Sequence, residues 1–141
     1  MKVREVMSTE PETVSPDDTI QKAAKKMNKF RIGSLIVATP GFEIIGIITE
    51  RDMLRAFAKG VKPSTKVKDV MTKGVVTIEE ASTLDEAANK MIKFGIKRLA
   101  VTKKGRCTGI VTATDLITYE SRLTDKMISL MQVPRKLLEA G

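Results

Sequence analysis

The segment Gly46-Ile47-Ile48-Thr49-Glu50-Arg51-Asp52 occurs a second time, 63 positions later, as Gly109-Ile110-Val111-Thr112-Ala113-Thr114-Asp115. Each copy is typical of a buried strand that ends at a threonine and is followed by the first turn of a helix. The correspondence extends upstream, because Val3-Arg4-Glu5-Val6-Met7 matches Val67-Lys68-Asp69-Val70-Met71 at an offset of 64. One duplication therefore covers most of the 141 residues.

Each copy shows the same order of local signals. Ser15 is a candidate N-cap for the first helix, with Pro16 at the first helical position, and Ser82 or Thr83 is the candidate in the second copy. Apolar residues at helical spacing follow, then two short strands around a glycine-containing turn, then a second helix. We therefore predict an α/β (α+β) fold in which each repeat forms a small sheet with two packed helices.

The predicted domain organisation follows the duplication. A first domain spans residues 1–60, a linker spans 61–64, and a second domain spans 65–120. Because a module of about 60 residues is marginally stable alone, we expect the halves to share a core. Residues 121–141 form a helical extension in which apolar residues share one face, so the last helix should continue to about Gln132, before Pro134. We expect this extension to pack on the parent core or on a twin subunit.

The composition excludes several classes of function. The chain has no histidine and one cysteine, Cys107, so histidine-based acid–base catalysis is excluded and neither a zinc site nor a disulfide is expected. There is no nucleophile–base pair, metal cluster or Walker loop, which predicts a protein that is not an enzyme and has no catalytic cofactor. There is no apolar run long enough for a membrane span and no signal peptide, which predicts a cytoplasmic protein. Only four Asn and Gln residues suggest a heat-adapted source.

The net charge is +8, which favours an anionic partner such as a nucleotide, a nucleic acid or an acidic protein surface. Each copy has the order strand–helix–strand–strand–helix. It begins with Val-x-x-Val-Met and has Gly-h-h-Thr-x-x-Asp at the last junction, where h is an apolar residue and x is any residue. This doubled pattern resembles the cystathionine β-synthase (CBS) domain. Two such domains in tandem form a Bateman module, and the resemblance covers roughly residues 3–120. It implies a pseudo-twofold axis and an energy-sensing regulator that binds AMP most readily, with ADP, ATP or S-adenosylmethionine as other ligands. It also implies homodimers that pair through helix faces, and a regulated target that the sequence does not name.

The resemblance implies two ligand clefts, each built from both repeats. Helix N-termini bind phosphate oxygens, and an aspartate can accept hydrogen bonds from the two ribose hydroxyls. The preferred cleft would contain Thr112, Thr114, Asp115, Lys97 and Arg98, with the base near Pro11, Glu12, Ile32 and Gly33. The second cleft would contain Thr49, Arg51, Asp52 and Ser34, with the base near Val75, Val76 and Ile96.

The two clefts differ on the phosphate side. Gly33-Ser34 stands at the positions of Lys97-Arg98, and only Arg51, opposite Thr114, partly compensates, so we predict tighter binding in the Asp115 cleft. Other interpretations remain open. The Thr and Asp residues could be helix caps, and Lys97 and Arg98 could be strand-edge charges. The whole chain could be a nucleic-acid-binding or scaffold protein with vestigial clefts, or a purely structural dimer.

Overall fold

The computed structural model describes residues 1–128, 130 and 131. Its α-helices are α1 (Ile20–Phe30), α2 (Glu50–Ala58), α3 (Leu84–Phe94) and α4 (Ala113–Tyr119), and its 3-10 turns are η1 (Val3–Glu5), η2 (Val67–Asp69) and η3 (Ser121–Leu123). Its strands are β1 (Ser8–Thr9), β2 (Thr13–Val14), β3 (Ser34–Ala38), β4 (Ile44–Thr49), β5 (Thr77–Glu79), β6 (Arg98–Lys103) and β7 (Arg106–Thr112). No helix in this part of the chain is both long enough and apolar enough to cross a bilayer.

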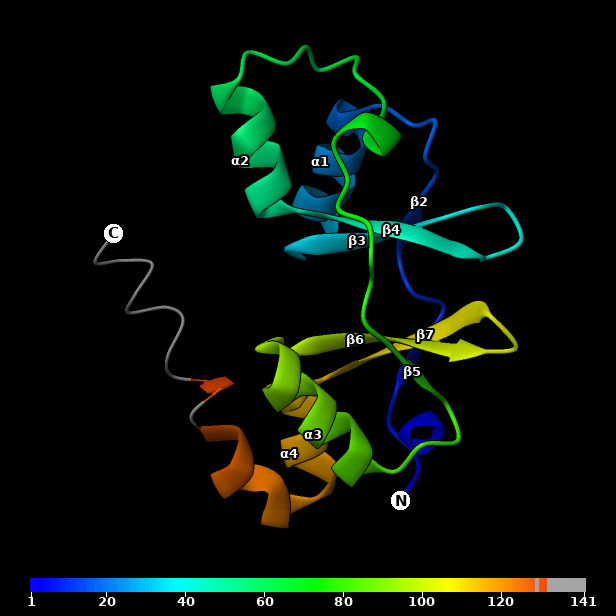
Figure 1. The fold of residues 1–141 in the computed structure, drawn as a ribbon, viewed down its shortest axis with the longest axis vertical. Helices are drawn as coiled ribbons and strands as arrows, with labels where there is room; N and C mark the ends of the chain where they lie inside the picture. The colour runs from blue at the N-terminus through cyan, green and yellow to red at the C-terminus, as the bar shows by residue number, and fades with distance from the viewer. Residues whose placement is uncertain (129, 132–141) are drawn as a thin grey trace. The chain divides into compact units, whose positions relative to one another are not determined.

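The chain divides into two compact units. The N-repeat unit comprises Pro11–Val75 and Gly105–Cys107, and the C-repeat unit comprises Met1–Glu10, Val76–Lys104 and the described residues from Thr108 onward. The first contains the sheet β2-β3-β4 and the second contains β1-β7-β6-β5. In each, a parallel pair (β2 with β3, β5 with β6) lies beside an antiparallel neighbour, and a pair of helices packs on one face of the sheet (Figure 1). The predicted α/β architecture is confirmed.

The opening segments are exchanged between the repeats. Val3, from the first copy of the opening, is fully buried in the core of the C-repeat unit, and Val67, from the second copy, is fully buried in that of the N-repeat unit. Each unit thus has its own hydrophobic cluster, and the prediction of one shared core is wrong. A single repeat taken alone would still lack part of its core, because the opening segment that completes each core belongs to the other repeat.

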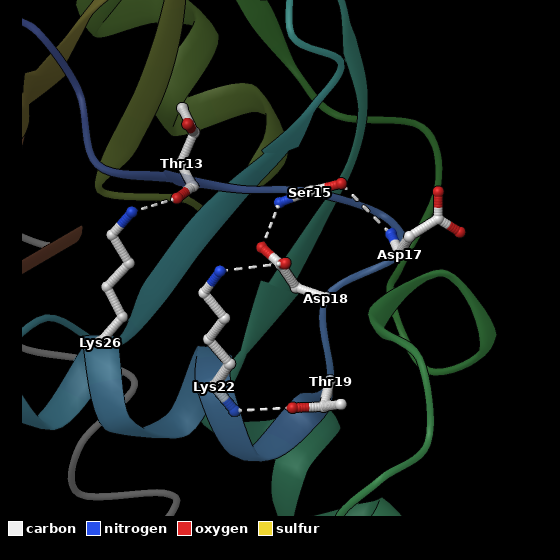
Figure 2. Close-up of polar contacts among 7 residues, drawn as sticks. All are labelled: Thr13, Ser15, Asp17, Asp18, Thr19, Lys22 and Lys26. Atoms are coloured by element: carbon white, nitrogen blue, oxygen red, sulfur yellow. Dashed lines mark hydrogen bonds and ion pairs between the residues drawn. The ribbon is translucent and has the colours of Figure 1, made fainter.

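The first helix begins later than predicted (Figure 2). Thr19 is the N-cap of α1, and its hydroxyl accepts the backbone N–H of Lys22 at 3.1 Å. Ser15 instead begins a turn, in which its N–H donates to the Asp18 carboxylate at 3.0 Å. The prediction of Ser15 as N-cap is therefore wrong, since the turn Ser15–Asp18 separates it from the helix. In the second repeat Thr83 caps α3 in the same way, which confirms one of the two predicted candidates.

The segment after α4 is not the predicted continuous helix. α4 ends at Tyr119, because Glu120 has extended backbone angles (φ −144°, ψ 87°), and residues 124–128 are helical again after the turn η3. This break lets the second helical segment lie beside α3 and α4 (Figure 1). There Leu123, Met127 and Leu130 join the core of the C-repeat unit, which confirms packing on the parent core. The predicted end near Gln132 and Pro134 lies outside the described residues.

Candidate functional site

The junction between β7 and α4 contains a reciprocal cap. The Thr112 hydroxyl accepts the N–H of Asp115 at 3.1 Å, and Asp115 Oδ2 accepts the N–H of Thr112 at 2.9 Å. Asp115 is half-buried, and no partner for its Oδ1 is found among the described residues. The capping interpretation is therefore correct for one oxygen, while the second has no partner among the described residues.

Two cations lie next to this junction. The N–H of Ala113, the first residue of α4, donates to the backbone carbonyl of Lys97 at 2.8 Å. Arg98 follows as the first residue of β6, and both basic side chains are exposed, as is Thr114 in the first turn of α4. The C-repeat unit thus brings together a carboxylate with a free oxygen and two solvent-accessible positive charges.

The junction between β4 and α2 has the same cap but a different environment. Asp52 Oδ2 accepts the N–H of Thr49 at 3.0 Å, and the Thr49 hydroxyl accepts the N–H of Asp52 at 3.1 Å. The remaining oxygen, Oδ1, accepts from the Arg55 guanidinium at 3.2 Å and from the Thr72 hydroxyl at 3.0 Å. With only 4% of its surface exposed, Asp52 has both oxygens occupied by the protein itself.

The surroundings of Gly33, the residue that corresponds to Lys97, differ in charge from those in the second repeat. The Glu50 N–H donates to the Gly33 carbonyl at 3.0 Å, just as Ala113 does to Lys97. The Glu50 carboxylate folds over Gly33, and a Cβ added to this glycine would lie 3.4 Å from its oxygen. In the first repeat an acidic side chain therefore lies close to the glycine that corresponds to Lys97, with exposed Arg51 as the neighbouring cation.

The predicted base-contacting residues divide between the units. In the N-repeat unit, Ile32 packs against the core, and Glu12 forms an ion pair with Lys26 at 3.3 Å. In the C-repeat unit, Val76 and Ile96 pack against the core. The remaining residues of the two predicted clefts, all in the N-repeat unit, are Pro11 and Val75, both half-buried, exposed Gly33 and half-buried Ser34.

Sequence reasoning missed Glu50, Arg55 and Thr72 as determinants of the first half-site. A signal was present, because these residues align with Ala113, Thr118 and Ser8 in the other copy, which lack their charge or length. The sequence-based prediction of unequal clefts rests on Gly33-Ser34 against Lys97-Arg98 and on Arg51 against Thr114. The contact between Thr72 and Asp52 joins residues 20 positions apart, so local patterns could not predict it.

A methionine–glycine contact connects the two ends of the repeated pattern. A Cβ on Gly46 would lie 2.6 Å from Met71 Sδ, and a Cβ on Gly109 would lie 2.7 Å from Met7 Sδ. The methionine of the opening segment Val-x-x-Val-Met therefore packs against the glycine of the strand segment Gly-h-h-Thr, where a side chain would clash with it. This contact explains why the two motifs occur together in each copy.

The comparison with protein-family models agrees with this architecture. The family model for the CBS domain matches residues 3–59 and again residues 67–122. The chain belongs to the CBS domain family. Both matches include a Thr-x-x-Asp junction, so the chain contains a CBS domain pair.

Several known proteins are similar to this CBS domain pair. The uncharacterized protein MK0525 of Methanopyrus kandleri is 36% identical over 126 residues, which cover 87% of this chain and 64% of that protein. The crystal structure of a putative acetoin utilization protein (AcuB) from Vibrio cholerae is 26% identical, with a TM-score of 0.79, over 92% of this chain and 96% of that one. The CBS domain pair of protein MJ0100, solved in complex with 5-methylthioadenosine and S-adenosyl-L-methionine, is 31% identical, with a TM-score of 0.73, over 89% of this chain and 96% of that one.

Proposed function

We propose that this protein is a regulator that binds an adenosine nucleotide, AMP in the first place and ADP or ATP as further ligands. The observation that carries the proposal is the free Oδ1 of Asp115 beside the exposed cations Lys97 and Arg98. A carboxylate oxygen accepts hydrogen bonds from vicinal ribose hydroxyls, and lysine and arginine bind phosphate. The Asp115 half-site combines both kinds of group.

The ligands of MJ0100 support the adenosine part of this proposal. That CBS domain pair was solved with two compounds that share an adenosine group and have no phosphate. In the present chain Lys97 and Arg98 lie next to the Asp115 junction, and these charges would favour a phosphorylated adenosine over the uncharged nucleoside.

The half-site at Asp52 is proposed to be the weaker one. A ribose would have to displace Arg55 and Thr72 from a nearly buried carboxylate, and hydrogen bonds to a charged group are worth about 1.5–3 kcal/mol. The Glu50 carboxylate would also repel a phosphate near Gly33. We therefore expect one ligand to bind well before a second.

The regulatory role is proposed to need no catalysis by this chain. Binding would be transmitted as a change in domain orientation or in oligomeric state, to a protein target that is yet to be identified, in the cytoplasm. Pairing into homodimers through helix faces stays a prediction. The exposed Leu54 and Phe57 on α2 and Tyr119 on α4 are candidate contacts for it.

The proposal is tested by calorimetry and thermal shift with AMP, ADP, ATP, adenosine, S-adenosylmethionine and 5-methylthioadenosine. A ligand at a hundred times its Kd should add about 2.7 kcal/mol to the free energy of unfolding. Asp115→Asn keeps an oxygen for the Thr112 N–H but presents an amide to the ribose, so AMP should bind at least about tenfold more weakly. Asp52→Asn is the matched control and should change AMP affinity by less than about threefold.

Two further comparisons make the test decisive. Lys97→Ala/Arg98→Ala should weaken AMP binding and leave adenosine binding unchanged, because only AMP carries the phosphate. If no adenosine compound shifts the melting temperature, or if Asp52→Asn abolishes binding while Asp115→Asn does not, the proposal is wrong. Salt-dependent binding of a short oligonucleotide that both aspartate variants retain would instead support the nucleic-acid-binding alternative.

A further inference from the structure

A small pocket lies between α2 and the segment that follows it in the N-repeat unit. On α2 and its C-cap the pocket is lined by Asp52, Arg55, Ala56 and Lys59, which share one side of the helix at i, i+3, i+4 and i+7. Its volume of about 220 Å³ corresponds to roughly seven water molecules at about 30 Å³ each. Sites for drug-sized ligands have about 300–1,000 Å³, so this pocket suits a smaller molecule, of about the size of an amino acid. We call it the α2–η2 pocket.

Part of the lining is apolar. Val61, Val70 and Met71 line the pocket from the segment after α2, and all three pack against the core of the N-repeat unit. Ala56 faces them from α2 with only 4% of its surface exposed. A ligand with an apolar side chain would remove that side chain and these residues from water together.

The polar part of the lining carries both signs of charge. Asp52 is held by Arg55 and Thr72, so these three side chains satisfy one another. Lys59 and Asp69 are exposed, and neither side chain has a polar partner among the described residues, although both line the pocket. Because the two basic and two acidic residues of the lining cancel in charge, the pocket favours neither a plain anion nor a plain cation.

The second repeat neutralises the charge that corresponds to Lys59. Arg122 stands at this position and forms ion pairs with Asp85 at 2.5 Å and with Glu120 at 2.6 Å. In the first repeat the counterparts of these two acids are uncharged, Gln21 and Phe57. The lysine therefore keeps a charge that its counterpart uses within the fold.

The acidic side of the pocket differs in the same way. Glu5 stands at the position of Asp69 in the other copy, and its Oε2 accepts the backbone N–H of Lys2 at 2.6 Å, which closes a local cap. Asp69 is shorter by one methylene, and the turn η2, formed wholly by described residues, has no such cap at Lys66. Both unpaired charges of the pocket are thus peculiar to the first repeat.

We propose that the α2–η2 pocket binds a small zwitterion, a free α-amino acid with an apolar side chain. The ammonium group of the ligand pairs with Asp69 and its carboxylate pairs with Lys59, as charge-assisted hydrogen bonds. Its side chain packs on Val61, Val70 and Met71. This combination uses each part of the lining, whereas a simple anion or cation would leave one charge unused.

The α2–η2 pocket is distinct from the other surfaces assigned to this unit. Leu54 and Phe57, the candidate dimer contacts, each follow a pocket residue by two positions, and residues at i and i+2 lie on different sides of a helix. Asp52 also belongs to the weaker nucleotide half-site, but Lys59 and Asp69 belong to neither predicted cleft. The amino-acid site therefore depends neither on pairing nor on nucleotide binding.

L-Leucine is the probe, and it is titrated into the full-length protein by calorimetry and followed by amide chemical shifts. 4-Methylpentanoate lacks the ammonium group of leucine, isopentylamine lacks its carboxylate, and glycine lacks its side chain. Lys59→Gln and Asp69→Asn each remove one proposed charge contact. Their matched controls are Lys62→Gln and Glu43→Gln, which remove exposed charges of the same unit that do not line the pocket.

Leucine should bind at least about tenfold more tightly than each of the three analogues, because each analogue loses one kind of contact. Lys59→Gln and Asp69→Asn should each weaken leucine binding at least about tenfold, while AMP binding and the urea midpoint of unfolding stay unchanged. Both controls should bind leucine like wild type, and the shift changes should centre on residues 52–72.

The proposal is overturned if leucine shows no saturable binding, if either singly charged analogue binds equally well, or if either pocket variant binds leucine normally. It is also overturned if the pocket variants lose AMP and leucine together, since the pocket would then be part of the nucleotide site. Failure of AMP to bind wild type would refute the nucleotide proposal and leave the leucine result as a separate outcome.

Discussion

Replacement of Gly109 by alanine tests the contact that links the two repeated motifs. The added Cβ would lie 2.6 Å from the Ser8 carbonyl oxygen and 2.7 Å from Met7 Sδ. Because carbon–oxygen contacts normally begin near 3.3 Å, the Ser8 backbone would have to move by roughly 0.7 Å. Ser8 is paired with Ile110 in the β1–β7 ladder, so this movement strains backbone pairing as well as packing.

We expect Gly109→Ala to lower the free energy of unfolding by about 3 kcal/mol, the upper end for overpacking. Gly46→Ala should cost about 1–2 kcal/mol, since its closest contact is the movable Met71 Sδ and the Thr72 carbonyl is 3.0 Å away. Gly41→Ala is the control, because its nearest neighbour is 3.9 Å away, and it should stay within about 0.5 kcal/mol of wild type.

Urea denaturation measures these differences, with an unchanged m-value showing that stability and not compactness has changed. A double-mutant cycle separates the two kinds of contact. Met71→Ala should relieve Gly46→Ala with a coupling of about 1 kcal/mol, whereas Met7→Ala should relieve Gly109→Ala much less, because the backbone clash remains. If Gly109→Ala is as stable as Gly41→Ala, the methionine–glycine explanation of the signature is refuted.

Further predictions concern polar contacts. Thr72→Val should destabilise the protein by about 1 kcal/mol in urea, because Asp52 loses a donor, while Ser8→Ala at the corresponding position should be nearly neutral. Thr19→Ala should cost about 1 kcal/mol by loss of the α1 cap, also measured in urea. The hydrogen bond from Arg122 lowers the pKa of Asp85 from 3.8, so this pair stabilises the folded state above that pH and stops doing so as the pH falls through the lowered value. The melting temperature of Asp85→Asn should therefore lie below that of wild type at pH 6 and equal it well below pH 3.8, and a constant difference would contradict this assignment.

Much of the fold was predictable because its signals are local. The helical spacing of apolar residues, the short apolar strand segments and the glycine-containing turns act over a few residues, and the duplication repeats each of them. The errors came where local signals competed. Ser15 and Thr19 are both good N-caps, and the turn at Asp18 decided between them. The helix break at Glu120 has no proline or glycine to mark it, because it depends on packing of the following segment against the core.

The candidate site divides in the same way. The sequence alone determined that there are two Thr-x-x-Asp junctions and that Lys97-Arg98 in the second repeat corresponds to Gly33-Ser34 in the first. Both facts depend only on residue identity and spacing. Only the tertiary structure decided which aspartate keeps a carboxylate oxygen without a partner among the described residues. Asp52 is occupied by Thr72 and Arg55, and Asp115 keeps an oxygen, because hydrogen bonds from outside the motif depend on how distant segments pack and not on the motif itself.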